Sequence, residues 1–199
     1  MEPNDTPRIT LRLRDLKALT LFSAKEDIRY YLESVYLEIA DGKLAMVATN
    51  GHQMAVLQDA APAGAPESYA GIIPTAAIHL AWKAARGIRS EDVHLVMAEP
   101  RCGLVLLNGM SIGFTLIDAK FPDWRHVIPA FQSGAVPGMV NLRYVADFQK
   151  FGDIVNGSGL HTRIHWNGED AALVKNDADP RFTGVLMPMH DRKAADQEK

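Results

Sequence analysis

Hydrophobic positions along this chain follow a helical period and then a strand period, and this order predicts a repeated structural unit. Residues 13–22 place leucines on one helical face, whereas residues 27–39 are rich in Tyr, Val, Leu and Ile at partly alternating positions, which is typical of strands. Residues 44–49 form a further predicted strand, bounded by an Asp-Gly pair and by a Thr-Asn-Gly turn. The pattern therefore predicts one helix followed by a β-meander.

The same order recurs twice further along the chain. A second helix is predicted for residues 74–87, entered at a proline and ended at a glycine, and three short strands follow within residues 93–118. A third helix is predicted for residues 140–152, with a glycine at its end, and residues 160–176 and 183–189 supply the strands after it. Units repeated at this scale share a core with their neighbours rather than folding alone.

A segment rich in Pro, Gly and Ser separates the second and third units. This segment, PAFQSGAVPGM at residues 129–139, is predicted to be a linker. We therefore expect an α+β chain with a first domain at residues 8–128, a half domain at residues 140–190 and a polar tail at residues 191–199.

Composition bounds the class of protein. The 199 residues are 47% hydrophobic, which is enough for a sizeable core, and the formal net charge of -3 excludes a basic nucleic-acid binder while leaving a local basic face open. The single cysteine, Cys102, lies in an apolar run, which indicates a core thiol, no intramolecular disulfide and a reducing, cytoplasmic setting. We expect no signal peptide and no membrane segment, because no apolar run approaches the roughly 18 to 20 residues of a membrane helix.

Candidate catalytic and metal-binding residues are few. His161 and His165 have the spacing of a metal pair on a helix, but the local pattern favours a strand, which would separate them, and no third ligand is nearby. No nucleophile elbow or phosphate loop is present around His52 or elsewhere. We therefore expect no enzyme activity, no cofactor and no metal.

Cations recur on the three predicted helices. A solvated helix face explains any one of them, but three helices that each carry cations raise the odds of a shared positive surface that contacts phosphates without reading sequence. The candidate DNA-facing residues are Arg14, Lys17, Lys83, Arg86, Arg89 and Lys150.

Long stretches of the chain resemble one family, the bacterial DNA polymerase III beta subunit, or sliding clamp. Residues 27–56, DIRYYLESVYLEIADGKLAMVATNGHQMAV, are similar to the opening half of that family's middle domain, which typically reads RYYLNG…LE…DG.L..VATDGHRLA. Residues 72–84 and 116–129 resemble the rest of that domain, ending in KFPDY.RVIP. Residues 140–148, VNLRYVADF, and 184–189, GVLMPM, resemble the last half of the third domain.

The resemblance implies the DNA-clamp fold, in which each domain is two helix-plus-meander units and helices line a ring around DNA. Three units then correspond to one and a half clamp domains. In that family, partners dock a short linear motif into an apolar pocket between the middle and last domains. By motif position this implies a peptide pocket formed by Arg29, Leu32, Thr49, Gly51, His52, Gln53, Met54, Pro122, His126, Val127, Asn141, Tyr144, Val185, Leu186, Met187, Pro188 and Met189.

The chain also departs from the family's pattern. The family's first domain and the first half of its third have no counterpart, and residues 129–139 stand where that half would be. Those parts supply the family's head-to-tail dimer interface, so ring closure by that route is in doubt. Gln53 and His126 replace two arginines of the pocket, and the usual MPMRL ending reads MPMHD, so partner preference is expected to differ.

Two hypotheses about function follow, and the sequence favours the first. In the first, the chain is a polymerase processivity factor that binds DNA polymerase and other proteins with clamp-binding motifs, and encircles duplex DNA, without sequence preference, as a homo-oligomer. In the second, it is an adaptor or decoy without a ring, for example phage-encoded, that captures the same motifs.

Overall fold

The computed structural model describes residues 7–85, 92–98, 101–131, 135–158 and 161–189. These residues form an α+β structure, as the sequence predicts. The helices are α1 (Leu13–Leu19), α2 (Thr75–Ala84) and α3 (Leu142–Asn156), with two short 3-10 helices, η1 (Tyr30–Leu32) and η2 (Trp124–Val127). The strands are β1 (Arg8–Arg12), β2 (Ser34–Ala40), β3 (Lys43–Thr49), β4 (Gln53–Ala60), β5 (Tyr69–Pro74), β6 (Asp92–Ala98), β7 (Arg101–Leu106), β8 (Ser111–Thr115), β9 (Thr162–Asn167), β10 (Asp170–Asn176) and β11 (Phe182–Leu186).

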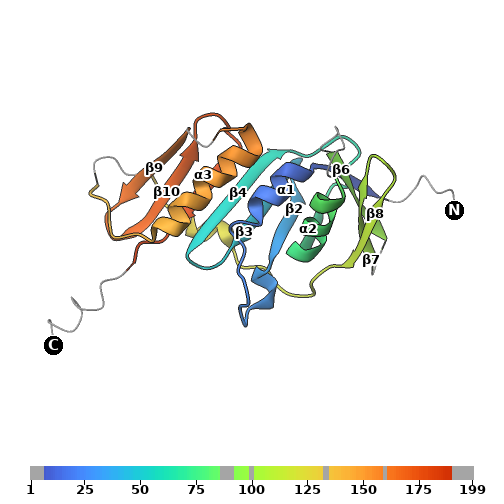
Figure 1. Ribbon diagram of the computed structural model, residues 1–199, viewed down its shortest axis with the longest axis horizontal. Helices are drawn as coiled ribbons and strands as arrows, with labels where there is room; N and C mark the ends of the chain where they lie inside the picture. Colours follow the sequence, from blue (N-terminus) through green and yellow to red (C-terminus); the bar gives the residue numbers. More distant parts are fainter. Residues whose placement is uncertain (1–6, 86–91, 99–100, 132–134, 159–160, 190–199) are drawn as a thin grey trace.

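An antiparallel sheet of seven strands runs through most of the molecule (Figure 1). Its strand order is β5-β2-β3-β4-β11-β10-β9. The seam between the first and third units lies at β4 and β11, where Phe182 pairs with Leu57 and Leu186 pairs with Gln53. The third unit therefore continues the sheet of the first unit through main-chain pairing.

The first and second units exchange the strands that precede their helices, here called leading strands. β1 leads into α1 but pairs with β6, in a four-stranded sheet of order β1-β6-β7-β8. β5 leads into α2 but pairs with β2 of the first unit. Each of these two sheets is thus completed by the leading strand of the other unit.

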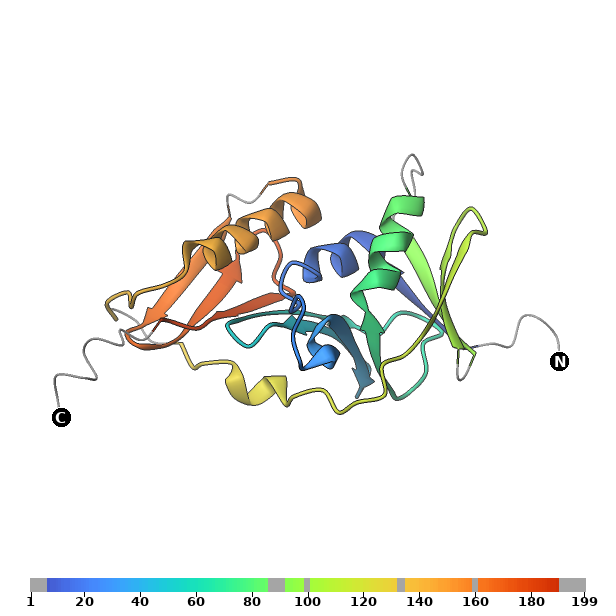
Figure 2. The same cartoon turned by 60° about the horizontal axis from the view of Figure 1, so that its bottom comes forward.

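Hydrophobic side chains form one cluster on each face of the seven-stranded sheet. The three α-helices lie on one face, called the helix face, and cover the larger cluster, which includes Phe22, Phe148 and Phe182 (Figure 2). Residues 116–128, called the strap, cross the opposite face and cover the smaller cluster, which includes Met54 and Trp124. We call this second face the strap face.

Local sequence explains where α3 begins and ends. The Asn141 side chain accepts a hydrogen bond from Arg143 N at 3.0 Å, which caps the helix start. The helix ends at Gly157, whose φ of +72° continues the chain in the left-handed region. The predicted end at Gly152 is therefore wrong, because this residue lies buried within the helix.

Other predicted elements need correction. Residues 27–33 are not strand: the backbone turns through η1, with Leu32 N donating to Arg29 O at 2.8 Å, and β2 begins at Ser34. β1 and β5 were not predicted as strands.

Some predicted features lie outside the described residues, namely the helix end at Gly87, the cations Arg86 and Arg89, and the polar tail. Cys102 is buried in β7, as expected. Within the described part of the chain, no helix has the length and apolar character needed to cross a membrane.

Candidate binding pocket

The polar turn between β3 and β4 is fixed by its own side chains. The side-chain oxygen of Asn50 accepts hydrogen bonds from the backbone N–H groups of His52, at 2.9 Å, and Gln53, at 3.0 Å. Thr49 Oγ1 accepts a hydrogen bond from Gly51 N at 3.1 Å and donates one to Gln53 O at 2.8 Å. The Thr-Asn-Gly-His sequence is therefore a structural corner that positions its neighbours.

Arg29 lies against this turn and is held there by a carboxylate. Gly51 has a φ of +87°, and a Cβ at this position would lie 3.3 Å from the Arg29 guanidinium nitrogens. Asp27 accepts hydrogen bonds from Arg29 Nε at 3.0 Å and from Nη2 at 2.8 Å. These hydrogen bonds lower the pKa of Asp27 to about 2, so the pair stays charged at neutral pH.

The strap supplies an aromatic floor beneath the turn. Trp124 is 3% exposed, and the Arg125 guanidinium lies 4.2 Å from the centre of its ring. Arg125 Nη2 also donates to Glu38 of β2 at 2.7 Å, which ties η2 to the sheet. Phe121 stacks on Tyr36, with ring centroids 4.7 Å apart, and this contact ties down the other end of the strap.

The third unit supplies a further wall through β11. Val185 pairs with Met54 across the seam, and both side chains belong to the cluster on the strap face. Met187, just after β11, donates its backbone N–H to His52 O at 2.9 Å and so extends the seam to the turn. The Met187 side chain is 40% exposed, so part of this wall stays open to solvent.

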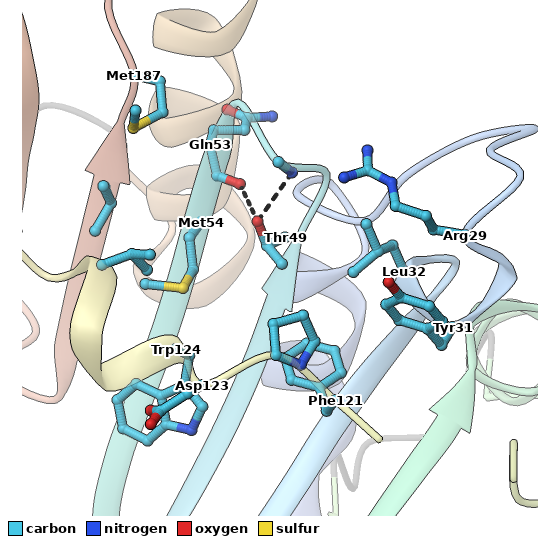
Figure 3. A pocket seen from close by; sticks show the side chains of 14 residues that line it. Arg29, Tyr31, Leu32, Thr49, Gln53, Met54, Phe121, Asp123, Trp124 and Met187 are labelled. Carbon is cyan, nitrogen blue, oxygen red and sulfur yellow. Dashed lines mark hydrogen bonds between the residues drawn. The ribbon is translucent and has the colours of Figure 1, made fainter. Parts of the chain in front are cut away.

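These elements enclose a pocket of about 260 Å³ (Figure 3). Its wall consists of Arg29, Tyr31, Leu32, Thr49, Gly51, Gln53, Met54, Phe121, Pro122, Asp123, Trp124, Val127, Val185 and Met187. Most of these side chains are apolar, and the two ionised ones are paired, Arg29 with Asp27 and Asp123 with His126. Such a pocket suits apolar side chains presented by a ligand.

The structure brings a large part of the predicted peptide site to this pocket. The predicted residues that line it are Arg29, Leu32, Thr49, Gly51, Gln53, Met54, Pro122, Val127, Val185 and Met187. They come from the first unit, from the strap and from the third unit, segments that are far apart in the sequence.

Other predicted residues do not line the pocket, because their side chains point elsewhere. Leu186 is fully buried under the helices, since successive residues of β11 alternate between the two faces. His52 faces α3 instead, where its ring stacks on Tyr144 with centroids 5.8 Å apart, and both line a neighbouring polar depression.

The remaining predicted residues lie around the pocket. His126 is exposed, with Nδ1 2.7 Å from Asp123 Oδ2. Asn141 caps α3, and Met189 donates its backbone N–H to Met139 O at 2.7 Å. Pro188 connects Met189 to the pocket residue Met187.

The sequence reasoning missed four residues of the wall, which are Tyr31, Phe121, Asp123 and Trp124. Each lies within two positions of a predicted residue, in the RYYL stretch at residues 29–32 or the FPDW stretch at residues 121–124. The signal was therefore the aromatic content of those two stretches, but which side chains face inward depends on how the strap crosses the sheet.

On the helix face, the predicted cations of α1 already have contacts within the chain. Lys17 Nζ lies 3.1 Å from His79 Nδ1, and burial followed by the charge of Lys25 lowers the pKa of Lys17. Arg14 Nη1 donates to the carbonyl oxygen of Val155 at 3.0 Å.

The cations of α2 and α3 are more exposed. Lys83 is exposed on α2. Lys150 Nζ donates to Asp147 at 2.9 Å, and both side chains lie on α3. Asp147 also accepts a hydrogen bond from Gln53 at 3.1 Å, so a carboxylate sits within the predicted positive surface.

Comparison with known proteins identifies relatives of the first two units. Residues 12–123 match the family described as DNA polymerase III beta subunit, central domain. The beta sliding clamp of Pseudomonas aeruginosa is 32% identical over 121 residues, and that of Vibrio cholerae is 38% identical over 132 residues. These alignments cover 59% and 61% of this chain but 32% of each relative, so the chain spans about a third of the length of the curated relatives that it matches.

Solved structures extend the likeness to nearly the whole chain. The DNA polymerase sliding clamp of P. aeruginosa superposes with a TM-score of 0.72 at 19% identity, covering 96% of this chain and 70% of that one. The clamp of Bacillus subtilis gives a TM-score of 0.74 at 16% identity, covering 94% and 65%. At these identities the likeness establishes the fold.

Proposed function

Because this chain belongs to the DNA polymerase III beta subunit family, we propose that it is a sliding-clamp-like replication protein that docks clamp-binding motifs of partner proteins in the apolar pocket. The observation that carries the proposal is the pocket itself, in which β4, β11 and the strap bring apolar side chains together from two units. Its partners would be DNA polymerase and other proteins that carry such a motif.

The chemistry of the pocket favours a short peptide that inserts apolar side chains. Met54, Trp124 and Val185 form an apolar floor, and Val127 and Met187 are partly exposed at the mouth. Trp124 Nε1 and Gln53 Oε1 are buried and have no hydrogen-bond partner in the described residues. A peptide carbonyl that reached the Trp124 indole would satisfy that group, whereas the Gln53 side chain points to the helix face, where its Nε2 donates to Asp147.

Binding of a fluorescently labelled clamp-motif peptide, measured by anisotropy, tests this proposal. Met187→Glu places a carboxylate in the apolar wall, and we expect the dissociation constant to rise by about tenfold or more. Met110→Glu is the matched control, because Met110 is 46% exposed in the β7–β8 turn, away from the pocket, and we expect it to bind like the unsubstituted chain. Equal affinity in all three proteins would contradict docking at this site.

We further propose that the helix face contacts duplex DNA without sequence preference. Lys17, Lys83 and Lys150 lie on helices that cover the same face of the sheet, which supports the proposal. Encirclement of DNA would in addition require several copies of the chain.

A second candidate function is an adaptor or decoy that captures clamp-binding motifs without forming a ring. It is favoured by the short connection between η2 and α3, residues 128–141, which leaves no room within the chain for a unit to pair with the third one. Peptide binding combined with no retention on duplex DNA at low salt would favour this candidate over the first.

A further inference from the structure

The first two units share one pattern of strand pairing. In each, the first strand of the meander, β2 or β6, pairs on its outer side with the leading strand of the other unit. The residue just before each helix pairs with the first residue of that meander strand, Pro74 with Ser34 and Arg12 with Asp92. The two leading strands are thus exchanged with the same register.

The third unit contains a segment with the sequence of a leading strand. Residues 136–141, VPGMVN, precede α3 as β5, YAGIIP, precedes α2. Both have glycine at the third position, two apolar residues after it and a helix N-cap at the end, Pro74 in one case and Asn141 in the other. The same pattern at the same distance from a helix indicates the same structural role.

This segment belongs to neither sheet. Its main-chain pairing consists of one isolated bridge between Pro137 and Gly168 and the hydrogen bond from Met189 N to Met139 O, and Val140 packs at the edge of the larger cluster. Val136 is 77% exposed and Met139 is 52% exposed. In the completed units the apolar residues of the leading strands are buried, as Ile9 and Ile73 are, with 0% exposed.

The strand that would receive it also lacks its neighbour. β9 is the third unit's counterpart of β2 and β6, yet in the described part of the chain it ends the seven-stranded order and pairs with β10 only. Its inward residues Ile164 and Trp166 are partly exposed. The matching residues of β2, Leu37 and Ile39, are buried, with exposed fractions of 0% and 1%.

We propose that two copies of this chain complete each other's third unit by exchanging residues 136–141, each of which adds a strand beside β9 of the other copy. The first two units each give their leading strand to the other, so the same reciprocal exchange between two identical third units gives a closed, symmetric dimer. The exchange replaces one bridge and one hydrogen bond with a full strand ladder. This inference rests on strand pairing alone and does not depend on peptide docking.

The hairpin ends fix the register of the exchanged strand. β2 and β9 each end in a two-residue hairpin loop, so Ala40 corresponds to Asn167 and Leu37 to Ile164. Gly71 pairs with Leu37 within the first domain, so Gly138 of one copy lies opposite Ile164 of the other. Met139 then lies opposite Arg163, and Val136 packs against Trp166.

Solution mass measured by multi-angle light scattering over a range of concentrations tests the dimer. We expect the unsubstituted chain to reach twice its chain mass, and Val136→Glu to remain monomeric, since it places a charge against Trp166 of the other copy. Because Val136 is 77% exposed in the single chain, the substitution should not disturb folding. Leu107→Glu, at an exposed residue of the β7–β8 turn, is the matched control and should dimerise normally.

The register is tested by a disulfide between copies. The double variant Met139→Cys, Arg163→Cys should give a covalent dimer under mild oxidation, visible on a non-reducing gel, whereas either single variant should give much less. A monomer at every concentration, or a dimer that persists unchanged in Val136→Glu, would overturn the proposal. A dimer without cross-linking in the double variant would overturn the proposed exchange.

Discussion

The two faces of the seven-stranded sheet offer a ligand different kinds of contact. The strap face presents apolar side chains around one pocket, and the ionised groups in its wall are already paired, as Arg29 is with Asp27. The helix face presents long cationic side chains. One of them, Lys150, forms an ion pair with Asp147 at 2.9 Å.

The two proposed partners, a peptide and duplex DNA, would therefore be held by different forces. Apolar contact in the pocket is insensitive to ionic strength, because it depends on removing hydrocarbon surface from water. Contact between exposed cations and phosphates weakens steeply with salt, because binding releases counterions from the DNA. Salt dependence of binding therefore distinguishes a ligand on the strap face from one on the helix face.

The largest effect on stability is expected at Arg181, whose guanidinium pairs with two buried carboxylates. Arg181 Nη1 donates to Asp15 at 2.8 Å and Nη2 donates to Asp179 at 2.7 Å, and both carboxylates are buried. Arg181→Met leaves two buried carboxylates without their cation, so we expect the free energy of unfolding in urea to fall by about 3–5 kcal/mol. The substitution breaks a link between α1 and the β10–β11 turn, and so tests whether the third unit is held by charge as well as by the sheet.

The matched control for Arg181 is an exposed ion pair of the same type. Arg163 Nη2 lies 2.7 Å from Asp177, and both side chains are more than half exposed. We expect Arg163→Met to unfold at nearly the same urea concentration as the unsubstituted chain. Equal destabilisation by the two substitutions would show that burial of the Arg181 cluster is unimportant.

The next effect is the salt dependence that distinguishes the two faces. Between 50 and 200 mM salt, we expect the affinity for a clamp-motif peptide to change less than about threefold, whereas three phosphate contacts would lose roughly 40-fold in affinity for duplex DNA. Titrations with labelled peptide and labelled duplex measure both. Lys83→Ala should reduce the slope of log affinity against log salt by about one for DNA and leave the peptide slope unchanged. Steep salt dependence of peptide binding would contradict the comparison.

The smallest effect concerns His79, which faces Lys17 on the helix face. Burial, followed by the charges of Lys17 and Lys25, lowers the pKa of His79 below its usual value. The unfolded chain therefore takes up the proton first, so this site's contribution to stability is lost as pH falls from about 6.5 through the lowered pKa. In an NMR titration, Lys17→Ala should raise the pKa of His79 partway toward its usual value, and a substitution at the distant Lys43 should leave it unchanged.

Much of the fold follows from local sequence. The Asp41-Gly42 pair predicts a hairpin because both residues tolerate positive φ, and their φ values are +51° and +70°. The spacing of apolar residues predicts the three helices because it places them on one face of each. The family motifs select most of the pocket wall, since those motifs contain the residues at the turn and at the end of β11.

The exchange of leading strands does not follow from local sequence. β1 reads Arg-Ile-Thr-Leu-Arg, with Ile9 and Leu11 buried, so an alternating signal for a strand was present. That signal carries no information about which sheet the strand joins, because pairing between distant strands depends on the packing of α1 against α2. The inward position of Trp124 is hidden for the same reason, since it depends on the path of the strap.

The seam between β4 and β11 has a consequence for the rate at which the pocket is entered. Sites formed between two parts of a protein commonly close on a ligand by hinge motion, and this closure delays binding. Here the pocket walls on either side of the seam share a continuous ladder, which Met187 N extends to His52 O at 2.9 Å, so a hinge would have to break main-chain hydrogen bonds. The pocket is therefore preorganised, and a peptide should associate in a single, ungated step.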